Sequence, residues 1–408
     1  MLRILESKDM GRVLARRDAR LHEAEDTVRP ILEAVRKRGD KGLIEYAKKF
    51  DGLERKTVRV PVAELAAAAA RLTPEFRSAV EMAAANVRKF AERQLPKPWQ
   101  SGQFGQLIRP LDTIGAYIPA GRYPLPSTVI MTAVPAIVAG VKNICIACPK
   151  AVDEVFGTAH ILGLEQVFQM GGAQAIAAFA YGTKTVPRAD RIVGPGNIYV
   201  AAAKKLLAGE VGIDFVAGPT EILIIANEGD PRFLAADMLA QAEHDTDASA
   251  ILLTTSRRLA AQVAKEVERQ LATLPTAPVA RKAIDKNSAV IIVKNLDEAA
   301  ELSNAFAPEH LSIHHEEILP QIRHAGSIFV GAFSPEAAGD YAAGPNHVLP
   351  TSGVARLRGG LSAADYVKVI SIQRLDVRAL RKLAPAITTL ARAEGLEAHA
   401  RSVEVRLA

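Results

Sequence analysis

The fold is decided by residues 113–148, which read TIGAYIPAGRYPLPSTVIMTAVPAIVAGVKNICIAC. A short run rich in apolar and β-branched residues, 113–118, precedes a longer apolar segment, 127–139, and a second short run, 143–147, follows. Short β-branched runs favour strands, and longer apolar segments bounded by glycine or proline favour helices. The stretch therefore predicts a strand, a helix and a second strand parallel to the first.

The same alternation continues for two hundred residues. Further strands are expected at 166–169, 191–193, 213–216, 221–226, 250–254, 289–293, 311–314 and 327–330. Helices are expected at 174–180, 197–207, 232–244, 260–272 and 297–305. This span is longer than one parallel sheet and its helices usually require. We therefore predict an α/β fold with two incomplete Rossmann-like units, each built on a parallel sheet.

Helical segments flank these units at both ends of the chain. Residues 30–50 carry a helical apolar stripe broken near Gly39, and Thr73 with Pro74 starts a helix that runs to about Leu95. The tail from about Val367 is charged and also has a helical pattern.

Composition excludes several classes of protein. The 408 residues are 49% hydrophobic and 24% charged, which is typical of globular chains and argues against disorder. Apolar runs are too short to span a bilayer, the first twenty residues lack the apolar block of a signal peptide, and two cysteines fit a reducing compartment, so we expect a cytoplasmic protein. The net charge of +6 comes without a basic block and with only 5% aromatic residues, which argues against nucleic-acid binding.

Three strand-to-helix turns could hold a nucleotide phosphate, although the chain has no G-x-G-x-x-G motif. They are Tyr117-Ile-Pro-Ala-Gly, Gly171-Gly-Ala-Gln and Gly194-Pro-Gly-Asn. A glycine turn that opens a helix offers free backbone N–H groups to an anion. Such turns also need glycine for backbone reasons alone, and Gln174 could either contact a ligand or cap the helix.

Two segments could carry metal and acid–base chemistry. Gln241 and His244 are three residues apart at the end of a predicted helix, so both can project from one face as metal ligands, although a histidine there also suits the helix dipole. Glu309 and His310 lie between a helix and a strand, where a carboxylate beside an imidazole can share acid–base work, or simply form a polar surface turn.

The segment from Gly339 to His347 is rich in small residues and contains Asp340. Asp340 could ligate a metal and His347 could contact a ligand, whereas the segment alone reads as a flexible surface loop. Cys145 and Cys148 have the spacing of a redox pair, but they close a strand rather than open a helix, so we expect buried, inert thiols.

Together these segments resemble the histidinol dehydrogenase family from about residue 20 to the end. Seven blocks appear in family order: Tyr117-Ile-Pro, Gly171-Gly-Ala-Gln-Ala-Ile-Ala-Ala, Gly194-Pro-Gly-Asn, Gln241-Ala-Glu-His, Ala307-Pro-Glu-His-Leu, Gly339-Asp-Tyr-Ala with Asn346-His-Val-Leu-Pro-Thr, and Ala393-Glu-Gly-Leu-Glu-Ala-His. The resemblance implies a zinc-dependent, NAD-linked enzyme of histidine biosynthesis that oxidises L-histidinol twice, through the aldehyde, to L-histidine.

The resemblance also implies a role for each matching residue. Zinc, one ion per subunit, would be held by Gln241, His244, Asp340 and His399. The acid–base pair would be Glu309 and His310. NAD would be contacted by Tyr117, Gln174 and Asn197. Substrate would be bound by Thr220, Gln241, His244, His310, Asp340, His347, Glu394 and His399.

The pattern of strands and helices, together with the resemblance, also predicts how the chain divides into domains. We expect an N-terminal helical arm over 1–20, a first α/β domain over 21–110 plus 223–365, and a second, NAD-side α/β domain over 111–222. The helical tail over 366–408 would be exchanged in a homodimer, so that His399 and Glu394 complete the neighbouring site.

Two positions depart from the family pattern. The family usually has serine where this chain has Thr220, and glycine where it has Ala120. Two alternatives therefore stay open: a related dehydrogenase of another terminal alcohol such as sulfopropanediol, and a non-catalytic nucleotide-binding protein. Glu394 favours histidinol, because a carboxylate matches a cationic or imidazole-bearing substrate better than a sulfonate.

Overall fold

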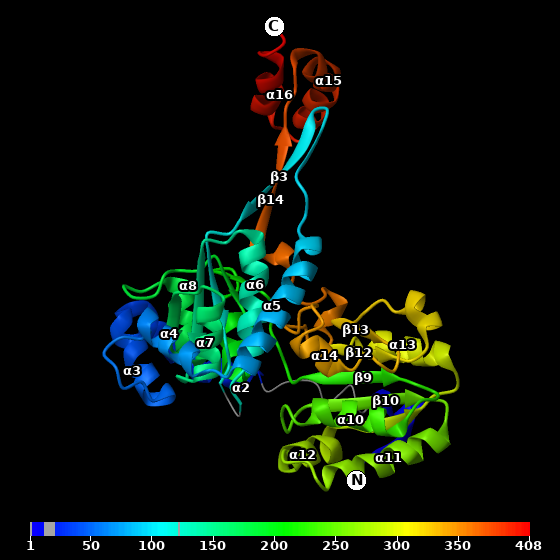
Figure 1. Ribbon diagram of the computed structural model, residues 1–408. Coiled ribbons are helices and arrows are strands. Elements are labelled where there is room, and N and C mark those ends of the chain that lie inside the picture. Colours follow the sequence, from blue (N-terminus) through cyan, green and yellow to red (C-terminus); the bar gives the residue numbers. More distant parts are fainter. Residues whose placement is uncertain (1, 12–20, 121–122) are drawn as a thin grey trace. The chain divides into compact units, whose positions relative to one another are not determined.

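The computed structural model describes residues 2–11, 21–120 and 123–408, and its larger sheet has six parallel strands (Figure 1). Their order across the sheet is β1-β11-β10-β9-β12-β13. Their bounds are β1 (Arg3–Glu6), β9 (Glu221–Ile225), β10 (Ser249–Thr254), β11 (Ala289–Ile292), β12 (His310–Ile313) and β13 (Ser327–Val330). Strands β9 and β12 are neighbours although 84 residues of chain, 226–309, separate them, so the order of the sheet reverses at this pair.

Both faces of this sheet are buried, because its strands alternate apolar residues toward two cores. Ile222 and Ile224 of β9 face one core with the helices of its side, while Leu223 and Ile225 face the other. The first core is closed by α10 (Pro231–Ala242), α11 (Arg257–Leu271) and α12 (Ala277–Asn287). The second is closed by α13 (Leu296–Phe306) and the 3₁₀ helix η3 (Glu316–Gln321).

The smaller parallel sheet has five strands in the order β6-β5-β4-β7-β8. Their bounds are β4 (Thr113–Tyr117), β5 (Asn143–Cys148), β6 (Gln166–Gln169), β7 (Arg191–Val193) and β8 (Gly212–Ile213). Numbered along the chain, these strands lie in the order 3-2-1-4-5, and the larger sheet repeats this order with β1 added at its edge. The prediction of two Rossmann-like parallel sheets is confirmed.

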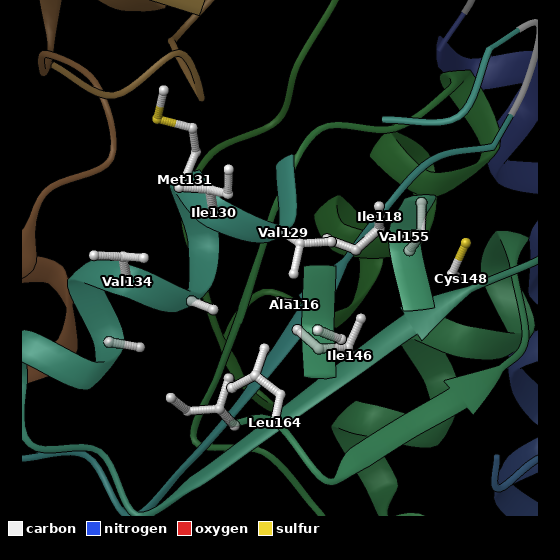
Figure 2. Packing of buried hydrophobic residues seen from close by; sticks show 14 of the residues in the cluster. Ala116, Ile118, Val129, Ile130, Met131, Val134, Ile146, Cys148, Val155 and Leu164 are labelled. Carbon is white, nitrogen blue, oxygen red and sulfur yellow. The ribbon is translucent and has the colours of Figure 1, made fainter. Parts of the chain in front are cut away.

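Helices cover both faces of the five-stranded sheet as well. Ile114 and Ala116 of β4 pack with one set of helices, and Tyr117 packs with the other. Figure 2 shows the first of these cores, where Ala116, Ile118 and Ile146 meet side chains of α6. This core includes α4 (Val62–Arg71), α5 (Pro74–Gln94), α6 (Pro126–Ala139) and α7 (Asp153–Ile161). The second includes α2 (Leu21–Arg38), α3 (Asp40–Asp51), α8 (Gly172–Tyr181) and α9 (Ile198–Leu207).

The packing corrects the expected grouping of the N-terminal region. We expected residues 21–110 to belong with the six-stranded sheet, but α2 to α5 bury their apolar sides in the two cores of the five-stranded sheet. The expected helical arm over 1–20 is also corrected where it is described, because residues 3–6 form β1 and pair with β11. Residues 12–20 of that arm lie outside the described residues.

A second unit contains residues 96–110 and 367–408. It is an antiparallel three-stranded sheet with two helices: β2 (Trp99–Ser101), β3 (Phe104–Pro110), β14 (Val367–Gln373), α15 (Val377–Ala393) and α16 (Glu397–Glu404). The tail was predicted to be helical from about Val367, but its first seven residues form β14, because β3 pairs with all of them. The helical prediction holds only from Val377 onward.

Local signals in the N-terminal helices fold as predicted. Thr73 caps α5 by accepting a hydrogen bond from the Phe76 N–H, and α2 and α3 are separated at Gly39. The remaining short elements are η1 (Ser7–Asp9), α14 (Glu336–Tyr341), η4 (Val354–Arg356) and η5 (Ala363–Tyr366). Among the described helices, none combines the length and apolarity needed to cross a bilayer.

Candidate active site

The acid–base candidates gather at the amino ends of β9 and β12. His310 is the first residue of β12, and Thr220 directly precedes β9. The two strands are adjacent and parallel, so their amino ends meet at one rim of the sheet. Helix α10 runs back along the sheet and brings Gln241, in its last turn, to the same rim.

A chain of hydrogen bonds links these segments. The Gln241 amide nitrogen donates to the Thr220 hydroxyl at 2.7 Å, and that hydroxyl donates to Oε2 of Glu309. The same carboxylate oxygen accepts the Glu221 N–H at 2.9 Å. With its nitrogen turned to Thr220, the Gln241 amide presents its oxygen to Nδ1 of His310 at 3.1 Å.

This chain decides which nitrogen of His310 can act as a base. Nδ1 faces only acceptors, the Gln241 amide oxygen and the Glu221 carbonyl oxygen at 3.3 Å, so it must carry a hydrogen. The lone pair of the neutral ring is then on Nε2. Nε2 lies 3.6 Å from Oδ1 of Asp340 and has no hydrogen-bond partner among the described residues.

Both members of the acid–base pair are buried and electrostatically perturbed. Burial alone lowers the pKa of His310, but the carboxylates of Glu336, Glu309 and Asp340 outweigh it and raise that pKa to about 10. Burial raises the pKa of Glu309 above its usual range, although the charge of His310 and the bonds from Thr220 and Glu221 oppose the rise. Both groups are therefore stronger bases than exposed side chains of the same type.

His244 and Asp340 have the geometry of metal ligands. Nδ1 of His244 lies 2.9 Å from the Ala240 carbonyl oxygen and so carries a hydrogen, which leaves the lone pair on Nε2. Nε2 lies 3.9 Å from Oδ2 of Asp340. A tetrahedral zinc ion with bonds of about 2.0 to 2.2 Å places two of its ligands about 3.3 to 3.6 Å apart, so these two atoms are a few tenths of an ångström farther apart than one ion requires.

The described residues of the first unit supply few candidate metal ligands. Within residues 2–11, 21–120 and 123–408, no three His, Cys, Asp or Glu side chains are close enough to hold a metal ion. His244 and Asp340 supply two such side chains, and the amide oxygen of Gln241 is a weaker third donor. A four-coordinate site needs one more ligand than this group supplies.

Asp340 and His347 do not belong to one flexible loop, as the sequence suggested. Asp340 lies in helix α14, and its carbonyl oxygen accepts a hydrogen bond from Nδ1 of His347 at 2.7 Å. Nε2 of His347 lies 3.4 Å from the buried Thr128 hydroxyl. Burial lowers the pKa of His347, which favours its neutral form. His347 therefore ties α14 to α6 beside the candidate metal ligands.

The last two predicted site residues belong to the second unit. His399 lies in α16, and Glu394 is the C-terminal cap of α15. Both side chains are exposed.

The predicted nucleotide contacts share one rim of the five-stranded sheet. Tyr117 ends β4, Gln174 lies in the first turn of α8 after β6, and Asn197 caps α9 after β7. Because the strands are parallel, these residues lie at their carboxyl ends, where the strand order reverses between β4 and β7. This is the position at which open α/β sheets bind ligands.

The turns at this rim are already hydrogen-bonded, contrary to the expectation of free N–H groups. Asp51, at the end of α3, accepts the Gly171 N–H at 2.8 Å and the Gln174 side-chain amide at 3.0 Å. The Tyr117 hydroxyl accepts the Gly172 N–H at 3.1 Å. An internal carboxylate thus occupies the start of α8, where a phosphate was a possible ligand.

A buried ion pair holds the turn that begins at Gly194. Lys204 donates to the Gly194 carbonyl oxygen at 2.6 Å and to Asp214 at 2.7 Å, while Asp214 accepts the Gly194 N–H at 2.8 Å. Gly194 has φ +107°, and an added Cβ would collide with the Tyr117 carbonyl oxygen. The pair therefore fixes, between Tyr117 and Asn197, a backbone conformation that glycine adopts readily and other residues rarely do.

The two cysteines are structural. Both are buried free thiols, and burial raises the pKa of Cys145 to about 12 and that of Cys148 to about 11. Figure 2 shows Cys148 in the apolar core. Neither is a nucleophile at neutral pH, because the thiolate is the reactive form.

Four buried or half-buried charged residues of these rims were missed by sequence reasoning: Asp51, Lys204, Asp214 and Glu336. Only Glu336 had a local signal, since it lies four residues before Asp340 and a helix places both on one face. The partners of Asp51 and Asp214 depend on how distant segments pack.

Comparisons with known proteins identify the family of this chain. The histidinol dehydrogenase family profile matches residues 14–407. The chain is 48% identical to a protein named histidinol dehydrogenase from Geobacter sulfurreducens, with 98% of this chain and 97% of that protein covered. It is 45% identical to one of the same name from Syntrophotalea carbinolica, covering 100% and 99%.

A solved structure is similar over the whole chain. The crystal structure of histidinol dehydrogenase from Elizabethkingia anophelis matches with a TM-score of 0.95 at 37% identity, covering 100% of this chain and 98% of that one. The fold is thus shared along the full length of the chain. The chain belongs to the histidinol dehydrogenase family.

Proposed function

We propose that the protein oxidises L-histidinol to L-histidine through the aldehyde, with two NAD as hydride acceptors. The observation that carries this proposal is the chain from Glu309 through Thr220 and Gln241, which fixes the hydrogen of His310 on Nδ1. It leaves Nε2 available as a base beside Asp340. Relatives named histidinol dehydrogenase, at 45 and 48% identity, support the choice of substrate.

In the first oxidation, His310 is the general base. Its Nε2 accepts the proton of the substrate hydroxyl, and the electron pair of the broken O–H bond forms the carbonyl as a hydride leaves carbon for NAD. The chain of hydrogen bonds keeps the imidazole in the tautomer and orientation that this step needs.

In the second oxidation, Glu309 is the base that activates water. Its carboxylate takes a proton while the water oxygen adds to the aldehyde carbon, and protonated His310 returns its proton to the former carbonyl oxygen. The hydrated aldehyde then loses a hydride to a second NAD and a proton to the neutral His310. Burial supports this role because it raises the pKa of Glu309. A bound water takes the place of a covalent thiol intermediate, since the two described thiols are inert.

We propose that Gln241, His244 and Asp340 hold zinc, because their oxygen and nitrogen donors meet at one rim. Bound zinc would polarise the substrate hydroxyl and offset the negative charge that raises the pKa of His310. The substrate lies against the same residues, with Thr220 and His347 at its edges.

We propose that NAD lies along the carboxyl rim of the five-stranded sheet, near Tyr117, Gln174 and Asn197. Residues 214–220 connect this rim to the amino rim of the larger sheet, where the hydride donor is bound. The two sheets would form two domains, one for each ligand, and the reduced thiols fit a location in the cytoplasm.

We propose that the second unit is exchanged in a homodimer, so that His399 of the partner subunit supplies the missing zinc ligand and its Glu394 contacts substrate. The surface of this unit supports the exchange. Large apolar side chains are exposed on it: Trp99, Phe104, Val369, Ile370, Val377, Leu383, Leu390, Leu396 and Val405. A small sheet with so much exposed apolar surface needs a covering partner.

The function is tested by counting NADH formed from limiting histidinol, before and after treatment with a zinc chelator. We expect two NADH per histidinol, with turnover lost on chelation and restored by added zinc. Sulfopropanediol is the comparison substrate. The family usually has serine at position 220, and the extra methyl group of Thr220 would narrow the substrate pocket. Faster oxidation of sulfopropanediol than of histidinol would contradict the proposal.

The shared site is tested by subunit mixing. His310→Asn and His399→Ala homodimers should both be inactive, and unfolding and refolding them together should recover about a quarter of wild-type activity, since half of the mixed population has one intact site. Recovery of no activity in dimers shown by mass to be mixed would contradict the exchange.

A further inference from the structure

Asp51 is an acid at the proposed nucleotide rim to which the proposed function gives no part. It is the last residue of α3, and it accepts the Gly171 N–H at 2.8 Å and the Gln174 side-chain amide at 3.0 Å. Both donors bind one carboxylate oxygen, Oδ2, and Oδ1 accepts neither bond. These two donors favour the charged form and oppose burial, which raises the pKa of Asp51. Oδ1 is therefore the acceptor that a ligand would use.

Asp51 is also the most accessible side chain of its hydrogen-bonded group. Tyr117 is 4% exposed and Gln174 is 1% exposed, whereas Asp51 is half-buried. The Tyr117 hydroxyl already accepts the Gly172 N–H, and the Gln174 amide nitrogen already binds Asp51. Of the three side chains, the carboxylate has the most surface for a cofactor at this rim to contact.

The place of Asp51 in the sheet matches that of an acid that binds a ribose. In dinucleotide-binding sheets, an acid beyond the first glycine turn, near the end of the second strand, accepts a ribose 2′ hydroxyl. Here the second strand of the five, β5, ends at Cys148, and Pro149 and Lys150 follow without an acid. A Cβ added to Gly171 would lie 2.5 Å from Cβ of Pro149 and 2.7 Å from Oδ1 of Asp51. Asp51 thus brings a carboxylate to this strand end from a distant helix.

A carboxylate at this place distinguishes two forms of the cofactor. The free 2′ hydroxyl of NAD donates a hydrogen bond to it, whereas the 2′-phosphate of NADP is negatively charged and is repelled. The exposed Lys150 is the competing group, because a cation there would accommodate the phosphate. The carboxylate is held by two hydrogen bonds, while a lysine side chain is long and flexible, so we expect the carboxylate to decide.

We propose that Asp51 is a specificity-determining residue that selects NAD over NADP, because its carboxylate accepts the 2′ hydroxyl of the adenosine ribose and repels a 2′-phosphate. This inference rests on the proposed function, which places NAD at this rim. Removing the charge of Asp51 should change the choice of cofactor more than it changes turnover.

The test compares Asp51→Asn, which removes the charge at constant size, with Asp51→Glu, which keeps the charge. Glu54→Gln is the matched control, because it removes an exposed carboxylate three residues away. For each protein, Kd for NAD and for NADP is measured by isothermal titration calorimetry without histidinol, and kcat with histidinol and Tm are measured alongside.

We expect the wild type and Glu54→Gln to bind NAD at least about tenfold more tightly than NADP, and Asp51→Glu to keep this preference. Asp51→Asn should bring the two Kd values within about threefold of each other, because the hydroxyl loses a charged acceptor and the phosphate is no longer repelled. The kcat at saturating NAD should stay near wild type in every variant. Should Asp51→Asn not fold, Asp51→Ser gives the same comparison.

A purely structural role for Asp51 would raise both Kd values by one factor and lower Tm. An unchanged ratio of the two Kd values in Asp51→Asn would therefore overturn the inference. A wild type that binds NADP as tightly as NAD would also overturn it, and would point to Lys150. If the wild type binds NAD selectively but forms no NADH from histidinol, the proposed function fails while the ratio still decides the role of Asp51. If NADH is formed and the ratio is unchanged, the function stands and the inference falls.

Discussion

The hydroxyl of Thr220 donates a hydrogen bond to the carboxylate of Glu309, across 89 positions of sequence. The same hydroxyl accepts the amide of Gln241, so one oxygen atom sets both the orientation of a proposed zinc ligand and the surroundings of a proposed base. Serine offers the same hydroxyl, which explains how threonine can stand where the family usually has serine.

Replacing Thr220 tests this relay. Thr220→Val keeps the shape but removes the hydroxyl, so the Gln241 amide loses the acceptor that fixes its orientation. We expect kcat with histidinol to fall about 10- to 100-fold, equivalent to about 1.4 to 2.7 kcal/mol of transition-state stabilisation. Thr220→Ser is the control and should stay within about threefold of wild type. Equal kinetics for valine and serine would show that the relay has no catalytic role.

The ion pair of Lys204 and Asp214 predicts that the stability of the protein and its affinity for NAD can be changed independently. Lys204→Met leaves Asp214 buried and unpaired, which should lower the free energy of unfolding by about 3 to 5 kcal/mol and raise KM for NAD, because Gly194 loses its clamp. Adding Asp214→Asn should recover part of the stability but not the KM. Denaturant unfolding and NAD titration at saturating histidinol measure the two. An unchanged KM for NAD in both variants would place the cofactor elsewhere.

Asp237 predicts a pH-dependent stability. Burial raises its pKa to about 6 in the folded protein, above the value of about 3.9 for an unfolded chain. The folded state thus keeps a proton that the unfolded state has lost between about pH 4 and pH 6, so stability falls as pH rises through this range.

Asp237→Asn should therefore be more stable than wild type by about 1 to 2 kcal/mol above pH 6 and equal to it near pH 4. Urea unfolding at several pH values measures the difference. A gain that stays constant from pH 4 to pH 8 would contradict the assignment of the pKa to Asp237.

The two thiols predict resistance to alkylation. With the pKa of Cys145 near 12 and that of Cys148 near 11, the native protein should react with no thiol reagent at pH 8, and two thiols should react after denaturation. Dehydrogenase activity should survive iodoacetamide. Inactivation at a rate matching the modification of one native cysteine would support a covalent route instead.

The sequence was sufficient for elements whose signals are local. The parallel strands around Ile114 and Ile222 follow from short apolar runs, and the cap at Thr73 follows from a hydroxyl before Pro74. Strand β14 was missed although Val367–Gln373 is rich in β-branched residues, which is a local strand signal. Its partner β3 lies about 260 positions earlier in the chain, so the pairing itself could not be read from the tail.

The sequence predicted which residue types form the candidate site, but not which hydrogen bonds join them. Spacing placed Gln241 and His244 on one helix end, and the adjacency of Glu309 and His310 suggested acid–base work. The tautomer of His310, by contrast, depends on which atom of Gln241 faces it, and that depends on Thr220.

Glu309 and His310 lie at the amino rim of the six-stranded sheet. The opposite rim is therefore a place where a label can be attached away from the proposed catalytic residues. Strand β9 has five residues, so its first and last Cα atoms are about 13 Å apart at about 3.3 Å per residue. A fluorescent label at the exposed Glu228, three residues beyond the carboxyl end of β9, would lie past the end of the strand opposite to Thr220. Such a label could report on the six-stranded sheet during turnover without touching the substrate.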